Sequence, residues 1–283
     1  MELLKRVTRT GRSLKTLALT TIALIFAAQI QAKTLSDDEK SLFIKMEIYE
    51  ALGEIAPQFN QGLAQSAAQY GIGDAVKQTI SQGFTQYLSK GALSNKFDAV
   101  IAGKIDSKAV TAGIKWYSTD LAKRFNDAEN AVNTAEAQQE MMGMAQQLMA
   151  DAQRVTIEQQ VIRSMSMAQQ FAELQKLTAL AIIENLSISQ SNGQAVDLTP
   201  VEQQLDANMP AMTAQLEQFL LLTFLYAHKD FTVEELKQYE TFNTSVEGKA
   251  INTAMTEALV ASVVQGMNEM SNATKASFQT AAN

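Results

Sequence analysis

The sequence predicts an all-α protein: a helical bundle of eight or nine helices with two related αα-corners and one long central helix. Three observations predict this class. The 283 residues include only 3 prolines and 13 glycines, so long tracts lack helix breakers. Ala, Gln, Leu, Met and Glu, which are good helix formers, fill these tracts. No alternating apolar and polar run bounded by turn residues predicts a strand.

Residues 1–32 have the pattern of an export signal. Five basic residues precede an apolar run from Leu17 to Ala28, and the stretch 27–32 resembles a small-residue cleavage site. We expect cleavage after Ala32, with cleavage after Ala28 as the alternative. An uncleaved membrane anchor is less favoured, because the apolar run is shorter than the roughly 20 residues of a spanning helix. The segment therefore predicts a protein of the periplasm of a Gram-negative bacterium, with no membrane span after signal removal.

Charge and cysteine content exclude several classes of partner. Residues 1–32 carry a net charge of +4, so their removal changes the net charge of the chain from −7 to −11. Nucleic-acid binding and docking on anionic lipids both need clustered basic residues, so neither is expected. The chain has no cysteine, so an exported form would be held by its core without disulfides.

The first helix signals lie at the start of the expected domain. Ser36 followed three residues later by Glu39 is a capping box that opens a helix, and Pro57 bends or ends this same helix. The stretch 71–74, with two glycines and an Asp, predicts a break before another helix. Segments 94–102 and 107–117 are expected to form the first corner.

A tract from Asp120 to about Ile188 contains no proline and predicts the long helix. Apolar residues recur along it at intervals of three and four, as on one side of a helix. Its only glycine is Gly143, so we expect one bent rod or two segments meeting there. The weakly charged, Gln-rich flanks favour packing in a bundle over a two-stranded coiled coil.

The second half begins after a loop centred on 191–193. Thr199, Pro200 and Glu202 combine a cap, a proline at the first helical position and an acidic third position, which predicts a strong helix start. The block Phe219–Tyr226 is apolar on every side and too short to span a membrane, so we expect it in the core.

The second corner follows this block. Thr232 and Glu235 form a capping box that predicts a helix from Val233, and Ser245 is the expected cap of the final helix. The expected domain, 33–283, comprises a first half at 33–130, the long helix at 131–190, a second half at 199–270 and a flexible tail at 271–283.

The two corners are related by a shift of 126 residues, which suggests an internal duplication; chance agreement between two Ala-rich segments is the alternative. The shift aligns cap, aromatic, hydroxyl, small and apolar positions: Ile105-Asp106 with Phe231-Thr232, Val110 with Leu236, Trp116 with Phe242, Thr119 with Ser245, Ala122 with Gly248, and Phe125 with Ile251.

The second corner is similar to the bacterial secreted family called domain of unknown function 2059. The lead-in Phe231–Leu236, the aromatic Phe242, and Ser245 with Gly248 match the family's capped helix, aromatic pair and Ser-Pro-x-Gly corner. Asn243 and Val246 stand where the family has Tyr and Pro. The first corner matches less well. The resemblance implies a helical envelope protein whose function is unassigned.

No residue set predicts chemistry. We expect His228, the only histidine, to be a surface group that compensates a helix dipole rather than a general base or ligand. The acidic runs Asp37–Glu39 and Glu234-Glu235 lie in first turns and are expected to serve the dipole rather than a cation. The stretch 71–73 lacks the third glycine of a nucleotide-binding loop. The sequence therefore predicts no catalytic, cofactor-binding or metal residues, and a protein that is not an enzyme.

Methionines are the remaining functional signal. Met141, Met142, Met144, Met165 and Met167 place thioethers on more than one helical side, for core packing or for an adaptable binding surface. The leading hypothesis is a non-catalytic periplasmic protein that binds another envelope protein, with a chaperone-like role included, through the long helix. A carrier of a small apolar ligand near Phe219–Tyr226 is the alternative. A hydrolase ranks last, because no base beside a nucleophile is visible. The oligomeric state is open.

Overall fold

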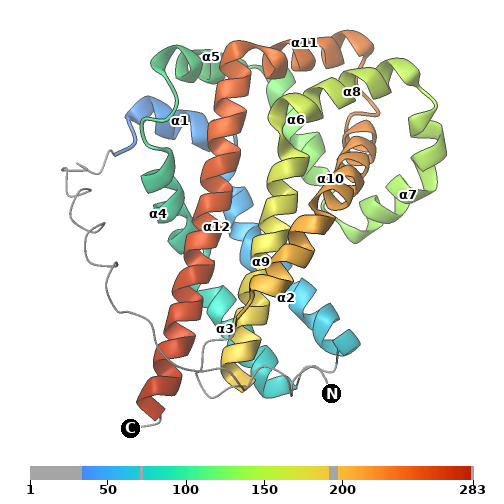
Figure 1. The fold of residues 1–283 in the computed structure, drawn as a ribbon. Helices are drawn as coiled ribbons and strands as arrows, with labels where there is room; N and C mark the ends of the chain where they lie inside the picture. The colour runs from blue at the N-terminus through green and yellow to red at the C-terminus, as the bar shows by residue number, and fades with distance from the viewer. Residues whose placement is uncertain (1–33, 71–72, 191–196, 282–283) are drawn as a thin grey trace. The chain divides into compact units, whose positions relative to one another are not determined.

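The computed structural model describes residues 34–70, 73–190 and 197–281 (Figure 1). In these ranges the chain forms twelve α-helices and no strand, which confirms the all-α bundle with more helices than predicted. The predicted signal peptide, residues 71–72 and the loop centre at 191–193 lie outside the described residues. The helices are α1 (Asp37–Lys45), α2 (Ile48–Tyr70), α3 (Asp74–Tyr87), α4 (Lys90–Ile101), α5 (Ser107–Tyr117), α6 (Asp120–Ala131), α7 (Ala135–Met149), α8 (Ala152–Met165), α9 (Met167–Gln190), α10 (Thr199–Ala227), α11 (Val233–Thr244) and α12 (Val246–Ala281).

The prediction of one long helix over 131–190 is wrong, because this tract forms α7, α8 and α9. The breaks occur at short polar residues. Thr134 and Asp151 cap the starts of α7 and α8 with their side-chain oxygens, and Ser166 adopts a left-handed backbone with φ 54° between α8 and α9. Such side chains compete with the backbone hydrogen bonds of a helix. Gly143, the predicted break, lies inside α7.

The final helix also departs from prediction. It continues past Met270 through Ala281, so 271–281 is helical rather than a tail. Ser271, expected to begin the tail, is only 3 % exposed. Packing of α12 against α3, α4 and α9 accounts for the extra turns, since tertiary contacts stabilise a helix beyond its own propensity.

Three predicted caps are present, but the cap predicted at Thr199 is wrong: Thr199 is already the first residue of α10, whose N-cap Leu198 makes no side-chain hydrogen bond. In both capping boxes the hydroxyl accepts from the third helical N–H at 3.2 Å, while the carboxylate accepts from the N-cap N–H at 2.8 Å. The boxes are Ser36 with Glu39 and Thr232 with Glu235. Ser245 Oγ accepts from the N–H of Gly248 at 3.0 Å and so caps α12.

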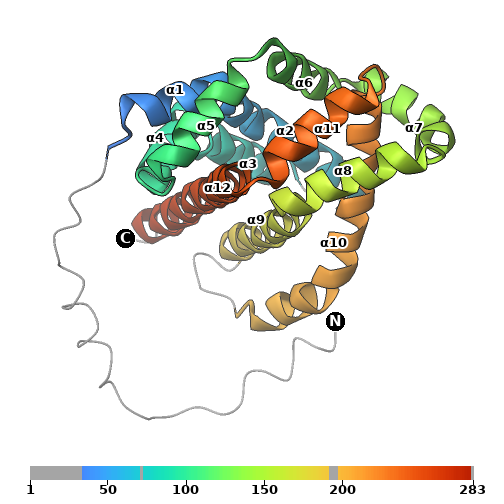
Figure 2. The same cartoon turned by 90° about the horizontal axis from the view of Figure 1, so that it is seen from above.

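The described helices enclose two hydrophobic cores. The first contains side chains of α1 to α5 together with α12 and one residue of α9. The second contains side chains of α8, α10 and α11 together with Ala168 of α9 and Phe125 of α6. Figure 2 shows α9 beside α12, and α9 also packs against α10, so α9 links the two cores. The first core thus includes α12 from the second half of the chain, and the second core includes Phe125 of α6 from the first half.

The two corners exchange their contacts reciprocally. Trp116 and Phe242, which the 126-residue shift aligns, stack on each other with ring centroids 5.0 Å apart. Tyr239 stacks on Phe125 with ring centroids 4.3 Å apart. The residues aligned with them, Gly113 and Ile251, also lie close together, since a Cβ on Gly113 would lie 2.8 Å from Ile251 Cδ1. Equivalent residues meet in this way when two units are related by an approximate two-fold axis. These contacts support the duplication.

A second shift, of 119 residues, relates α1 to α8. It aligns the buried pair Leu42-Phe43 with Val161-Ile162, and the left-handed residue Glu47, with φ 57°, with Ser166. In both halves the left-handed residue joins a short helix to a long one, α2 with 23 residues or α9 with 24. The relation between the halves therefore extends beyond the corners. The prediction of one helix from the Ser36 cap to Pro57 is wrong, because Glu47 divides α1 from α2 and Pro57 lies inside α2.

The second corner depends on close approach at Gly248. A Cβ there would clash with the carbonyl oxygen of Phe242 and lie 2.9 Å from its carbonyl carbon. Because these are backbone atoms, Gly248→Val is expected to destabilise the fold by about 2 kcal/mol or more and lower Tm. Lys249→Ala, at an exposed neighbouring position, should stay within about 0.5 kcal/mol. Equal shifts of Tm for the two variants in thermal unfolding would contradict the tight-corner argument.

Candidate functional site

His228 is fully buried, so the expectation of a surface group is wrong. His228 is the C-cap residue of α10, but this end of the helix lies inside the second core. Aromatic rings surround the imidazole, with centroids 4.8 to 5.7 Å from its own: Phe125, Phe224, Phe231 and Tyr239. These rings come from α6, α10, the turn after α10, and α11, so tertiary packing covers the histidine.

Two carboxylates contact the two ring nitrogens. His228 Nδ1 lies 2.8 Å from Glu158 Oε1 of α8, and Nε2 lies 3.3 Å from Glu129 Oε1 of α6. The hydroxyl of Tyr239 donates to the same Glu129 oxygen at 2.7 Å. Since Glu158 is itself fully buried, the cluster joins four helices through charge inside the core.

The protonation state of the imidazole follows from these neighbours. Burial by itself would lower the pKa of His228, but the hydrogen bonds and charges of Glu129 and Glu158 outweigh burial and raise it to about 9. Burial, followed by the charge of Glu129, raises the pKa of Tyr239 well above its usual value. At neutral pH, His228 is a cation that donates from both nitrogens, and Tyr239 is a neutral donor.

Arg154 performs the dipole compensation that the sequence suggested for His228. Its Nη1 donates to the carbonyl oxygen of His228 at 3.0 Å, and its Nη2 donates to that of Phe231 at 2.5 Å. Carbonyls at a helix C-terminus lack intrahelical partners and carry partial negative charge, which a guanidinium satisfies. Sequence reasoning missed Arg154 because it comes from α8, far from α10 in the chain.

The first half contains a corresponding buried carboxylate. The 119-residue shift aligns Glu39 with Glu158, and both reach the turn that precedes a corner. Glu39 Oε1 accepts from the backbone N–H of Gly103 at 2.9 Å, whereas Glu158 contacts an imidazole. An acidic anchor at this turn is therefore common to both halves, and the histidine belongs to the second half alone.

This arrangement favours a structural role for the histidine cluster. A general base needs a ring nitrogen that can reach a substrate, whereas both nitrogens of His228 already contact carboxylates and the ring is 0 % exposed. A buried charged group with two partners instead ties together the elements that supply them.

The predicted acidic runs lie where the sequence placed them. Asp37 and Asp38 are exposed in the first turn of α1, and Glu234 is exposed in α11. Glu235 completes its capping box and also pairs with Arg124 of α6. Among the residues that the structure describes, no group of three or more His, Cys, Asp or Glu side chains is arranged to hold a metal ion.

The methionines divide between core and surface. Met141 and Met165 are buried, and Met167 is partly buried against the second core, so these side chains serve packing. Met142 and Met149 are 64 % and 48 % exposed. Seven residues separate them, which places both on the same side of α7.

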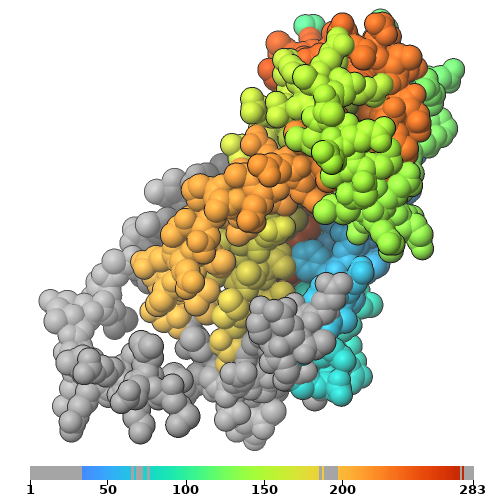
Figure 3. Space-filling model, turned by 90° about the vertical axis from the view of Figure 1, so that its right-hand side faces the viewer, coloured from blue at the N-terminus to red at the C-terminus, as the bar shows by residue number. Residues whose placement is uncertain are grey.

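A third exposed apolar side chain lies on the neighbouring helix. Phe219 of α10 is 51 % exposed, and α7 packs against α10. Phe219 shares a side of α10 with Tyr226, seven residues later, whose hydroxyl donates to Glu140 of α7 at 2.8 Å. Figure 3 shows α7 and α10 next to each other on one face of the molecule. We call Met142, Met149 and Phe219, with the helices that carry them, the α7/α10 face.

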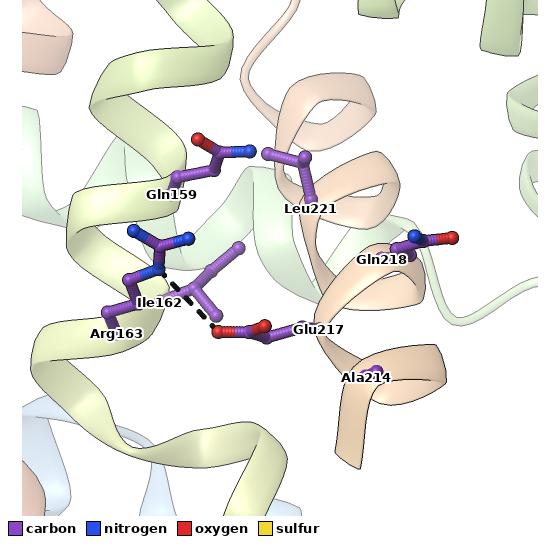
Figure 4. A pocket seen from close by; sticks show the side chains of 7 residues that line it. All are labelled: Gln159, Ile162, Arg163, Ala214, Glu217, Gln218 and Leu221. Carbon is purple, nitrogen blue, oxygen red and sulfur yellow. Dashed lines mark ion pairs between the residues drawn. The ribbon is translucent and has the colours of Figure 1, made fainter. Parts of the chain in front are cut away.

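A small cavity of about 240 Å³ lies between α8 and α10 (Figure 4). Arg163 Nε and Glu217 Oε1 face each other across it, 3.6 Å apart. It is lined by Gln159, Ile162, Arg163, Ala214, Glu217, Gln218 and Leu221. The lining is mainly polar, and the block Phe219–Tyr226 contributes only Leu221, because most of that block packs in the second core.

Comparisons with protein-family models, curated proteins and solved structures found no match to this chain. The resemblance of the second corner to a secreted family therefore stays a prediction.

The histidine cluster predicts a specific pH dependence of stability. Because the pKa of His228 is about 9 in the folded state and about 6.5 when unfolded, the folded state binds the proton more tightly. The resulting stabilisation, on the order of 3 kcal/mol, is fully present below pH 6.5 and is lost as pH rises through 9.

Urea unfolding at several pH values between 6 and 9.5 measures this loss. The wild type should lose more stability over this range than His228→Gln, which is less stable at pH 6 and cannot titrate there. Parallel curves for the two proteins would show that His228 does not carry a raised pKa.

Proposed function

We propose that this is a non-catalytic periplasmic helical protein that binds another protein of the cell envelope through the α7/α10 face. One observation carries the proposal: three of the five large apolar side chains described as exposed lie on α7 and α10, and these two helices pack together. Exposed large apolar side chains on neighbouring helices mark candidate interaction sites. A chaperone-like role is one form of such binding.

The way α7 is attached supports its role as the presenting element. Only Met141 of α7 is buried, and the hydrogen bond that Tyr226 donates to Glu140 is the polar contact described between α7 and α10. Met142, next in sequence, points outward. Methionine is flexible and polarizable, so it can adapt to partner surfaces of different shape. Because these side chains are only about half exposed, covering each contributes less than the roughly 1.5–3 kcal/mol of a fully exposed one.

A carrier of a small apolar ligand is the alternative, and the structure gives it less support. Leu220, Phe224 and Leu225 pack against other core side chains, and the cavity beside this block is small and mainly polar. Hydrolysis ranks last, since the only histidine is enclosed by aromatic rings and carboxylates.

The periplasmic location rests on the pattern of residues 1–32. Among the described helices, none combines the length and hydropathy needed to cross a bilayer. We expect protein from the periplasmic fraction to begin at Lys33. N-terminal sequencing checks this, and a chain that still begins at Met1 in the cell envelope would indicate an anchored protein.

Native mass spectrometry of the protein from the periplasmic fraction tests the binding role. We expect a protein adduct that is lost in the double variant Met142→Gln with Met149→Gln and retained in Val246→Gln. Val246 is 81 % exposed on α12, so it is a matched apolar-to-amide control away from α7. A lipid adduct released only on unfolding, with no protein adduct, would instead favour the carrier.

A further inference from the structure

The methionines of this chain differ sharply in exposure. The structure describes twelve of the 13, and among these only Met142 and Met149 are exposed, at 64 % and 48 %. The other ten are buried or partly buried. The two exposed side chains lie seven residues apart in α7, so they occupy the same side of this helix, about two turns from each other. Within the described residues, α7 is therefore the helix that presents thioether sulfur most openly to solvent.

Thioethers are the side chains of this protein that an oxygen-atom donor attacks most readily. The chain contains no cysteine, so no thiol competes for the oxidant. Hydrogen peroxide transfers one oxygen atom to a methionine sulfur, which loses two electrons and becomes a sulfoxide, while the peroxide is reduced to water. The reaction replaces a flexible apolar side chain with a polar one.

Other methionines of the same helix are protected. Met141, next to Met142 in sequence, is only 2 % exposed, and Met144 is partly buried. Oxygen transfer needs contact between the oxidant and the sulfur, so Met141 reacts only after local opening of the structure. Met142 and Met149 need no such opening and belong to neither core, so their oxidation leaves the packing of the cores intact.

We propose that Met142 and Met149 form a reversible oxidation site that controls the docking of a partner on α7. As thioethers they present apolar surface, whereas a sulfoxide is hydrated and is costly to bury without a matching hydrogen bond. Oxidation therefore weakens docking. Two-electron reduction by a methionine sulfoxide reductase, which releases the oxygen as water, restores the thioethers and the docking. The control of docking rests on the proposed function, but the oxidation site does not.

Two features favour control over incidental damage. The exposed sulfurs lie on one side of one helix rather than scattered over the surface, so two oxidations change a single surface. Core methionines such as Met165 and Met267 are shielded, so the fold persists while α7 is oxidised. The periplasm that we propose for this protein is also an oxidising compartment, in which such a site would be used.

Peptide mapping by mass spectrometry, after timed exposure of the native protein to hydrogen peroxide, tests the oxidation site. Because a buried thioether reacts only after local opening, we expect Met142 and Met149 to gain oxygen at least about tenfold faster than Met165 and Met267. Met141, on the same helix, should also react more slowly than its exposed neighbours. In urea that unfolds the chain, all five should react at similar rates.

Equal rates for Met141, Met142 and Met149 in the native protein would show that α7 opens as a whole, which would overturn the selective site. Rates for the two exposed residues no higher than those of the core methionines would overturn it as well.

Native mass spectrometry tests the control of docking. The purified protein is oxidised, freed of peroxide and mixed with a periplasmic extract from untreated cells. We expect the oxidised wild type to lose the protein adduct and to regain it after treatment with methionine sulfoxide reductase. Met142→Leu with Met149→Leu keeps two apolar side chains but has no sulfur at these positions, so it should retain the adduct after peroxide treatment. An unchanged Tm shows that the oxidised protein is folded.

An adduct that survives oxidation of both exposed sulfurs would overturn the control of docking. Loss of the adduct from the oxidised double leucine variant would overturn it too, because the effect would then come from other residues. Absence of any adduct with the untreated wild type would instead refute the proposed function, and the control of docking with it, while the oxidation rates decide the oxidation site separately.

Discussion

The reciprocal packing of the two αα-corners holds the described helices together. Phe125, which follows the first corner, lies in the second core, while its aligned partner Ile251 lies in the first. Trp116 and Phe242 stack where the corners meet. Because each half completes the core of the other, neither can bury its apolar residues alone, and we expect the two cores to unfold together.

The same plan accounts for the buried carboxylates. Glu39 and Glu158 occupy aligned positions and each anchors the turn before a corner, one through a backbone N–H and the other through His228. In the second half, the charged imidazole lies between the carboxylates of Glu129 and Glu158, and removal of His228 would leave the Glu158 carboxylate buried without its partner. A histidine that looks like a catalytic candidate by composition therefore acts as a link between α6, α8, α10 and α11.

The proposed binding surface is separate from the elements that stabilise the fold. The corners and α12 are packed on many sides, whereas α7 has one buried side chain and rests chiefly on α10. An element with so few internal constraints can present adaptable thioethers without disturbing the cores. On the proposed function, the binding surface therefore lies outside the regions that define the fold.

The sequence by itself determined the helical class, both capping boxes and the cap at Ser245, because these depend on residues a few positions apart. It did not locate the breaks at Thr134, Asp151 and Ser166, since short polar side chains end a helix only when the surrounding packing favours the turn. Tertiary structure alone decided the burial of His228, whose partners lie 70 and 99 residues away in the chain. It likewise decided which methionines face outward, because a helical stripe reveals a shared side but not whether another helix covers it.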